Sequence, residues 1–179
     1  IPVAIANFAG EGLLPQALTG VVRADLERSG LFKMIDPGPA QVPENAAIDL
    51  NQWKDRGADA LALASILPVP GGRYEVRMRL YDIARQNKPD GMIFVFAPAT
   101  MRETGHRIAD FIYEKMTGEK GVFSTRIAYV SKSAGRFELK VDDADGQNPR
   151  TALRSTEPII SPAWSPDGSR LAYVSFQAK

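Results

Sequence analysis

Two closely spaced glycines near the start of the chain are the first residues whose pattern suggests chemistry. Gly10 and Gly12 follow an apolar run and precede a helical pattern, and Asp36 lies after the next apolar run. This is the outline of a dinucleotide site, in which a third glycine lets the helix pack closely. Pro15 occupies that third position, so we interpret the segment as a turn that leads into a helix and expect no cofactor.

The acidic run at 142–146 is a second candidate, because its spacing suggests a calcium loop. Aligning Gly146 with the invariant glycine of such a loop puts Val141 at the first ligand position and Ala152 at the glutamate position. Neither side chain supplies an oxygen ligand. We interpret the run as a turn between strands with solvated carboxylates, and we expect no bound metal.

His106 is the only histidine, and the chain has no cysteine. A multi-histidine metal site, a disulfide and a cysteine nucleophile are therefore excluded. The sequence also holds no G-x-S-x-G elbow, the turn that exposes a serine nucleophile. Since His106 lies between Gly105 and Ile108 in a helical pattern, we expect it at a flank, in a surface or partly buried structural role. We expect no catalytic residue and no enzyme activity.

Basic side chains gather around one predicted hairpin. They are Arg73, Arg77, Arg79, Arg85 and Lys88. Such a group could meet an acidic partner, but it is more often the solvated face of an edge strand that resists aggregation. The whole chain carries 22 basic and 21 acidic residues, a formal net charge of +1. The field that would attract nucleic acid is missing, so we expect no nucleic-acid partner.

The elements that must position these residues change character at about Gly121. Ahead of it we expect strands at 1–8, 31–35, 58–67, 73–83 and 92–97, a helix from Leu14 to Gly30, a short helix at 51–56, and a helix from the capping box Thr100-x-x-Glu103 to Gly118. This order predicts an α/β or α+β domain over 1–121 with a mixed sheet, because hairpins pair antiparallel and helix crossovers permit parallel pairing. Trp53 and, farther on, Trp164 are expected to be core anchors.

Beyond Gly121 short strand runs alternate with turns, and one run is repeated. Residues 126–131 return at 170–175, 44 positions later, with one conservative difference in six positions. A period of about 40 to 45 residues is typical of β-propeller blades. Since a propeller closes with about four to eight blades, we expect 122–179 to hold the first blade and part of the second of an incomplete propeller.

Longer motifs carry a resemblance to a known family. The run Ser-Pro-Ala-Trp-Ser-Pro-Asp-Gly-Ser at 161–169 resembles the repeat of TolB propellers, and 113–130 resembles the junction that enters their first blade. The front domain is similar as well, at Gly30-Leu31-Phe32, at Gly57-Ala58-Asp59-Ala60 and at Arg79-Leu80-Tyr81-Asp82. The chain therefore resembles the TolB family along its whole length.

The resemblance implies an anticodon-binding-like fold for the front domain, with no RNA binding, and then the truncated start of a six-bladed propeller. It implies a non-enzymatic adaptor of the Tol-Pal envelope system in the periplasm, exported with its signal peptide removed, that serves outer-membrane integrity and cell-division constriction. Its partners would be the lipoprotein Pal, bound by the propeller, and TolA, bound by a segment ahead of the first strand. We expect that segment and most blades to be missing here, and no partner-binding residue is assigned.

One alternative comes from the enzyme class. Pro-Asp-Gly motifs also occur in propellers attached to peptidases, so the chain could be the propeller-bearing portion of a prolyl-oligopeptidase-like hydrolase. The α/β domain directly ahead of the propeller, with its TolB-like junction, favours the adaptor. No apolar run approaches the roughly 18 residues that span a bilayer, so we expect no direct membrane insertion.

Overall fold

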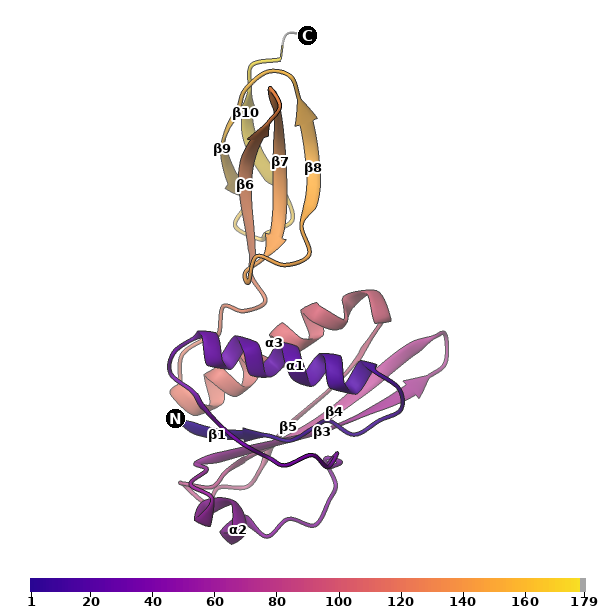
Figure 1. Ribbon diagram of the computed structural model, residues 1–179, viewed down its shortest axis with the longest axis vertical. Coiled ribbons are helices and arrows are strands. Elements are labelled where there is room, and N and C mark those ends of the chain that lie inside the picture. Colours follow the sequence, from indigo (N-terminus) through magenta and orange to yellow (C-terminus); the bar gives the residue numbers. More distant parts are fainter. Residues whose placement is uncertain (178–179) are drawn as a thin grey trace. The chain divides into compact units, whose positions relative to one another are not determined.

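The computed structural model describes residues 1–177 and divides into two compact units. The first runs from Ile1 to Gly121, and the second begins at Val122. Helices and a mixed sheet form the first unit, while antiparallel strands form the second (Figure 1).

The first unit has the predicted element order. Its elements are β1 (Pro2–Ile5), α1 (Leu14–Arg28), β2 (Lys33–Ile35), α2 (Leu50–Asp55), β3 (Ala60–Val69), β4 (Arg73–Asp82), β5 (Asp90–Phe96), the short 3-10 helix η1 (Pro98–Thr100) and α3 (Met101–Thr117). The strands lie in the order β2-β1-β3-β4-β5. β1 pairs parallel with β2 and with β3, whereas β3, β4 and β5 pair antiparallel. The predicted mixed sheet is therefore confirmed.

Both faces of this sheet are covered, but unequally. Helices α1 and α3 lie on one side and α2 on the other (Figure 1). The apolar stripes of the two long helices, which include Leu18 and Ile108, are completely buried, as their helical spacing demands. On the opposite face Trp53 of α2 packs with Leu61 and Leu63 of β3, so its prediction as a core residue is confirmed.

The start of α3 differs from the predicted capping box. Thr100 is the residue before the helix, but its side chain does not cap it and instead donates to the Ala97 carbonyl at 3.1 Å. Glu103 pairs with Arg107 at 2.6 Å. The chain enters α3 through η1, so Thr100 lacks the extended backbone that a capping residue needs. The predicted stop is confirmed, because Gly118 closes the helix with φ of 81°.

The basic row on β4 is exposed, but β4 is not an edge strand as predicted. It lies between β3 and β5, and β5 forms the edge. The residue pattern predicts a strand at 92–97, but it does not record that this strand returns along β4. Arg73, Arg77 and Arg79 therefore lie on a solvent-exposed face of an interior strand and do not protect the sheet edge.

The second unit consists of two small antiparallel sheets. Its strands are β6 (Arg126–Ser133), β7 (Arg136–Asp143), β8 (Arg150–Ser155), β9 (Ile159–Trp164) and β10 (Leu171–Ser175). One sheet has the order β6-β7-β8, and the other pairs β9 with β10. The repeated run falls on β6 and again on β10, so both copies form strands. Trp164, at the end of β9, is only half-buried and is not the core anchor that the sequence predicts.

Candidate functional site

The glycine turn after β1 is explained by close packing. A side chain at Gly10 would place its Cβ 2.7 Å from the Ile66 carbonyl oxygen and 2.8 Å from the Pro15 ring, and φ at Gly10 is 153°. Its amide donates to the Gln41 side chain at 3.3 Å. Glycine is required here by the neighbouring strand and the helix start, which agrees with the interpretation of a helix-entry turn.

The polar groups near this turn are also engaged within the first unit. Asp36 accepts a hydrogen bond from the Gly38 amide at 2.9 Å and so closes a local turn. Arg23 donates to the Ile5 carbonyl and to the Asn7 side chain. Burial lowers the pKa of the Arg23 guanidinium, and the Asp36 charge partly offsets that shift. These groups stabilise the loops at the strand ends.

His106 forms a buried pair with Asp25. Its Nδ1 lies 2.5 Å from Asp25 Oδ2, and the two side chains are 2% and 0% exposed. The predicted surface or partly buried position of His106 is therefore wrong, because α1 packs against α3 on this face. Arg28 reaches the other Asp25 oxygen at 3.1 Å. The two partners are 81 residues apart, so no local pattern indicates the pair.

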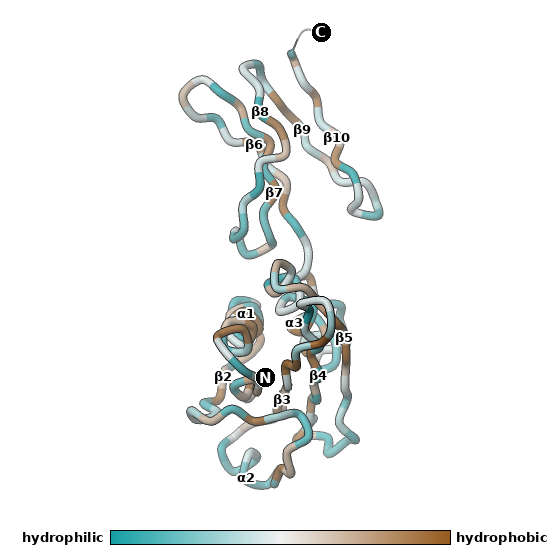
Figure 2. Tube along the Cα trace, turned by 90° about the vertical axis from the view of Figure 1, so that its right-hand side faces the viewer, coloured by the Kyte–Doolittle hydropathy of each residue, from teal (hydrophilic) through white to brown (hydrophobic). Residues whose placement is uncertain are grey.

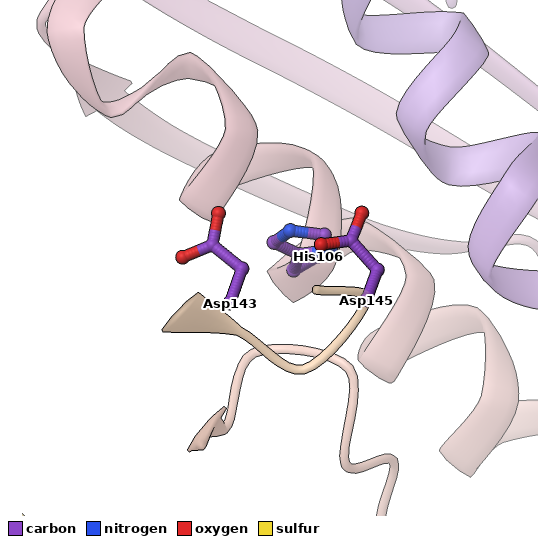
Figure 3. Close-up of side chains that lie close together, drawn as sticks. All are labelled: His106, Asp143 and Asp145. Carbon is purple, nitrogen blue, oxygen red and sulfur yellow. The ribbon is translucent and has the colours of Figure 1, made fainter. Parts of the chain in front are cut away.

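The acidic run of the second unit forms a turn, as predicted. The Gln147 amide donates to the Asp145 carboxylate at 3.0 Å, and the Gly146 amide donates to the Asp143 carbonyl at 2.9 Å. Asp143 ends β7 and Asp145 lies within the turn (Figure 3). These bonds are those of an Asx-type connection between strands.

Asp142 is not solvated, although the sequence predicts solvated carboxylates along this run. It is 8% exposed, because it lies within β7 and not in the turn. The Tyr129 hydroxyl donates to its Oδ2 at 3.0 Å. That hydrogen bond raises the pKa of Tyr129 above its ordinary value. The pair joins β6 to β7 through side chains as well as backbone.

An aromatic and cationic cluster lies where the two sheets of the second unit meet. The Arg126 guanidinium stacks 4.7 Å from the centre of the Trp164 ring, and its Nη2 donates to the Gly168 carbonyl at 2.6 Å. A shallow depression of about 340 Å³ opens beside them, and its lining consists of Ser124, Thr125, Arg126, Trp164, Ser165, Pro166 and Gly168. Arg126 is the only ionisable side chain in this lining. Arginine and aromatic side chains are both enriched at protein-protein interfaces.

The Ser-Pro-Asp-Gly-Ser turn beside this depression is held by its own side chains. Asp167 accepts from the Ser165 hydroxyl at 2.5 Å, from the Ser169 hydroxyl at 2.7 Å and from the Ser169 amide at 3.1 Å. These bonds lower the pKa of Asp167 to about 2. Ser165 in turn accepts from the Arg170 amide at 2.9 Å. The repeat motif is therefore a local turn whose residue types fix the entry to β10.

Several apolar side chains on the second unit are open to solvent. Ile160 of β9, Val174 of β10 and Phe176 after β10 are each about half exposed. A propeller blade covers such residues by packing its sheet against the next blade. The pattern therefore fits the predicted start of a propeller.

Two family models match the chain. The model described as the TolB amino-terminal domain matches residues 1–88, and the model described as the TolB beta propeller domain matches residues 113–179. A protein of Dechloromonas aromatica named Tol-Pal system protein TolB is 58% identical over 179 residues, which are 100% of this chain. The chain belongs to the TolB family. The resemblance inferred from the sequence motifs is thereby confirmed.

Other members of the TolB family extend the comparison. A protein of Aromatoleum aromaticum with the same name is 57% identical over 99% of this chain. The crystal structure of TolB from Acinetobacter baumannii matches 99% of this chain with a TM-score of 0.81 and 34% identity, over 44% of its own length. The chain spans 42% of each of the two named relatives, so it corresponds to less than half of their length. Within residues 1–177 no helix has the length and apolarity needed to cross a membrane.

Proposed function

We propose that the protein is a non-enzymatic adaptor of the Tol-Pal envelope system in the periplasm. It serves outer-membrane integrity and cell-division constriction through protein-protein binding. Residues 1–121 act as the amino-terminal domain, and residues 122–179 supply the first blade and part of the second. Pal binds through the propeller, and TolA binds through a segment ahead of the amino-terminal domain.

The observation that carries this proposal is the identity of 58% along the whole chain with a Tol-Pal system protein. The site geometry supports it. Around the depression beside Trp164, stacking and turn hydrogen bonds engage the polar groups, and Arg126 is the only ionisable side chain in the lining. A lining of this kind, with an aromatic ring and one cation, suits the binding role that we propose.

A chimeric protein tests the proposal. This chain replaces the matching residues of the Dechloromonas aromatica relative, and the chimera is exported in a strain from which the relative's own gene is deleted. We expect it to restore detergent resistance and to stop leakage of periplasmic proteins as well as the unaltered relative does. A matched chimera with Trp53→Asp, which unfolds the amino-terminal core, should fail.

A chimera that accumulates in folded form in the periplasm but leaves the cells leaky would contradict the proposal. The amount of folded chimera is measured by limited proteolysis of the periplasmic fraction. This measurement distinguishes a chimera that is folded but inactive from one that does not fold.

A further inference from the structure

The edge strand β5 lacks the features that usually protect a sheet edge. Its run Gly91 to Phe96 is Gly-Met-Ile-Phe-Val-Phe, with no proline and no lysine. The single charge of the strand is Asp90, which pairs with Lys115 of α3 at 2.7 Å. An edge strand presents a row of unpaired amides and carbonyls. Figure 2 shows hydrophobic residues along this edge of the first unit.

One face of β5 is open to solvent. Ile93 is 65% exposed and Val95 is 45% exposed. They pair with Arg77 and Glu75 of β4 in the sheet register. Trp53 and its neighbours cover the same face only farther along, over Leu61 and Leu63 of β3. The opposite face of β5 is apolar and better covered, through half-buried Met92 and Phe94 and buried Phe96.

The open face is positively charged. β4 contributes Arg73, Arg77 and Arg79 to it and only one acid, Glu75. Glu75 is neutralised by Arg77 at 2.6 Å. Within residues 1–177, Arg73 and Arg79 have no ion-pair partner.

From these observations we propose that β5 docks an extended segment of another protein by strand addition. The segment carries acidic residues at alternate positions and apolar residues between them. Its backbone pairs with the outer edge of β5. Its apolar side chains extend the row of Met92 and Phe94. One of its carboxylates lies beside Gly91, where no side chain of β5 separates it from Arg79 of β4.

Synthetic peptides test the docking site. A labelled peptide of alternating valine and glutamate, about eight residues long as in an ordinary strand, is titrated with the whole chain and followed by fluorescence anisotropy. A matched peptide has lysine in place of every glutamate. We expect the acidic peptide to bind at least about tenfold more tightly than the basic one, a difference that corresponds to about 1.4 kcal/mol.

Chain variants locate the site. Ile93→Glu should weaken the acidic peptide by about tenfold or more, because it adds a like charge at the strand edge. Arg79→Glu should weaken the acidic peptide and strengthen the basic one. Leu31→Glu is the matched control, since Leu31 is exposed elsewhere on the first unit, and it should leave binding unchanged. Circular dichroism checks that each variant is folded.

Backbone methylation separates strand addition from contact by side chains alone. In one acidic peptide the valine amides are N-methylated, and in another the glutamate amides are. Alternate amides of a strand point to opposite edges, so only one of the two peptides should lose binding.

Three outcomes would overturn the proposal. The first is that the acidic and basic peptides bind equally or not at all. The second is that both methylated peptides bind as tightly as the unmethylated acidic peptide. The third is that the chain alone sediments as a dimer which Ile93→Glu dissociates, because a second copy would then occupy the edge.

Discussion

Asp25 and His106 show how one polar pair fixes the packing of two helices. Both side chains are buried, and their contact joins α1 to α3. Removing His106 deprives the buried Asp25 side chain of a hydrogen-bond partner, while Arg28 stays on its other oxygen. The expected loss exceeds that of an exposed ion pair, because the lost hydrogen bond lies where water is excluded.

The variant His106→Ala should therefore lower the free energy of unfolding of the first unit by about 2 to 4 kcal/mol. Urea unfolding followed by far-UV circular dichroism measures this, since the helices of the described residues all lie in that unit. Arg107→Ala is the control, because the Arg107 pair with Glu103 is exposed and should contribute under about 1 kcal/mol. Equal losses in the two variants would show that the buried pair has no special role.

The hydrogen bonds to Asp167 lead to a prediction about how this side chain titrates. Its folded pKa of about 2 lies below the ordinary value of 3.8, so its hydrogen bonds favour folding above about pH 3.8 and lose that effect as the pH falls through about 2. An NMR titration of the Asp167 side chain should show a midpoint near that lower value. Ser165→Ala and Ser169→Ala each remove one hydroxyl donor, and each should raise the midpoint. A midpoint near 3.8 in the unaltered chain would contradict the hydrogen-bonded turn.

At the scale of elements, the contact between α1 and α3 depends on a glycine. A Cβ at Gly105 would lie 2.7 Å from Val21 Cγ1 and 2.8 Å from Val21 Cβ. Both partners belong to packed helices and neither can move alone. The small residue lets the two helices approach closely.

The variant Gly105→Ala should destabilise the first unit, because overpacking costs about 1 to 3 kcal/mol and exceeds the roughly 1 kcal/mol that alanine gains in a helix. Gly20→Ala is the matched control, since Gly20 lies in α1 with no atom near its missing Cβ. It should stabilise the unit by about 0.5 to 1 kcal/mol. Urea unfolding of both variants measures their free energies of unfolding. A higher free energy of unfolding for Gly105→Ala would mean that the helices can move apart without cost.

The elements themselves could be predicted from short-range pattern, and their long-range contacts could not. The alternation along β4 and the stripes of α1 and α3 follow from which side chains must be buried, so these elements were predicted correctly. Thr100 has the residue type of a cap, but η1 changes its backbone. The place of β5 beside β4, and the pairing of His106 with Asp25, depend on contacts between distant residues that no periodicity records.

At the scale of the whole molecule, the two units differ in how well they bury their own apolar side chains. The first unit encloses its long helical stripes, whereas Ile160, Val174 and Phe176 of the second are open to solvent. The start of a propeller could be predicted from the repeat at 126–131 and 170–175, because successive blades repeat the same turn and strand. The prediction that Trp164 is a core residue is wrong, because its ring stacks with Arg126 beside an open depression and not inside a core.

Together with the proposal that the propeller binds Pal, this difference leads to a prediction. The chain spans 42% of the Dechloromonas aromatica relative, and a Pal surface assembled from several blades would lie mostly in the remainder. Losing even two anchor contacts worth about 2 kcal/mol each would weaken binding about a thousandfold. We therefore expect this chain to bind Pal far more weakly than the full-length relative does, while its first unit stays folded. Calorimetric titration of Pal into both proteins measures the ratio. Affinities within about tenfold of each other would place the binding surface in these residues and would make the depression beside Arg126 and Trp164 its first candidate.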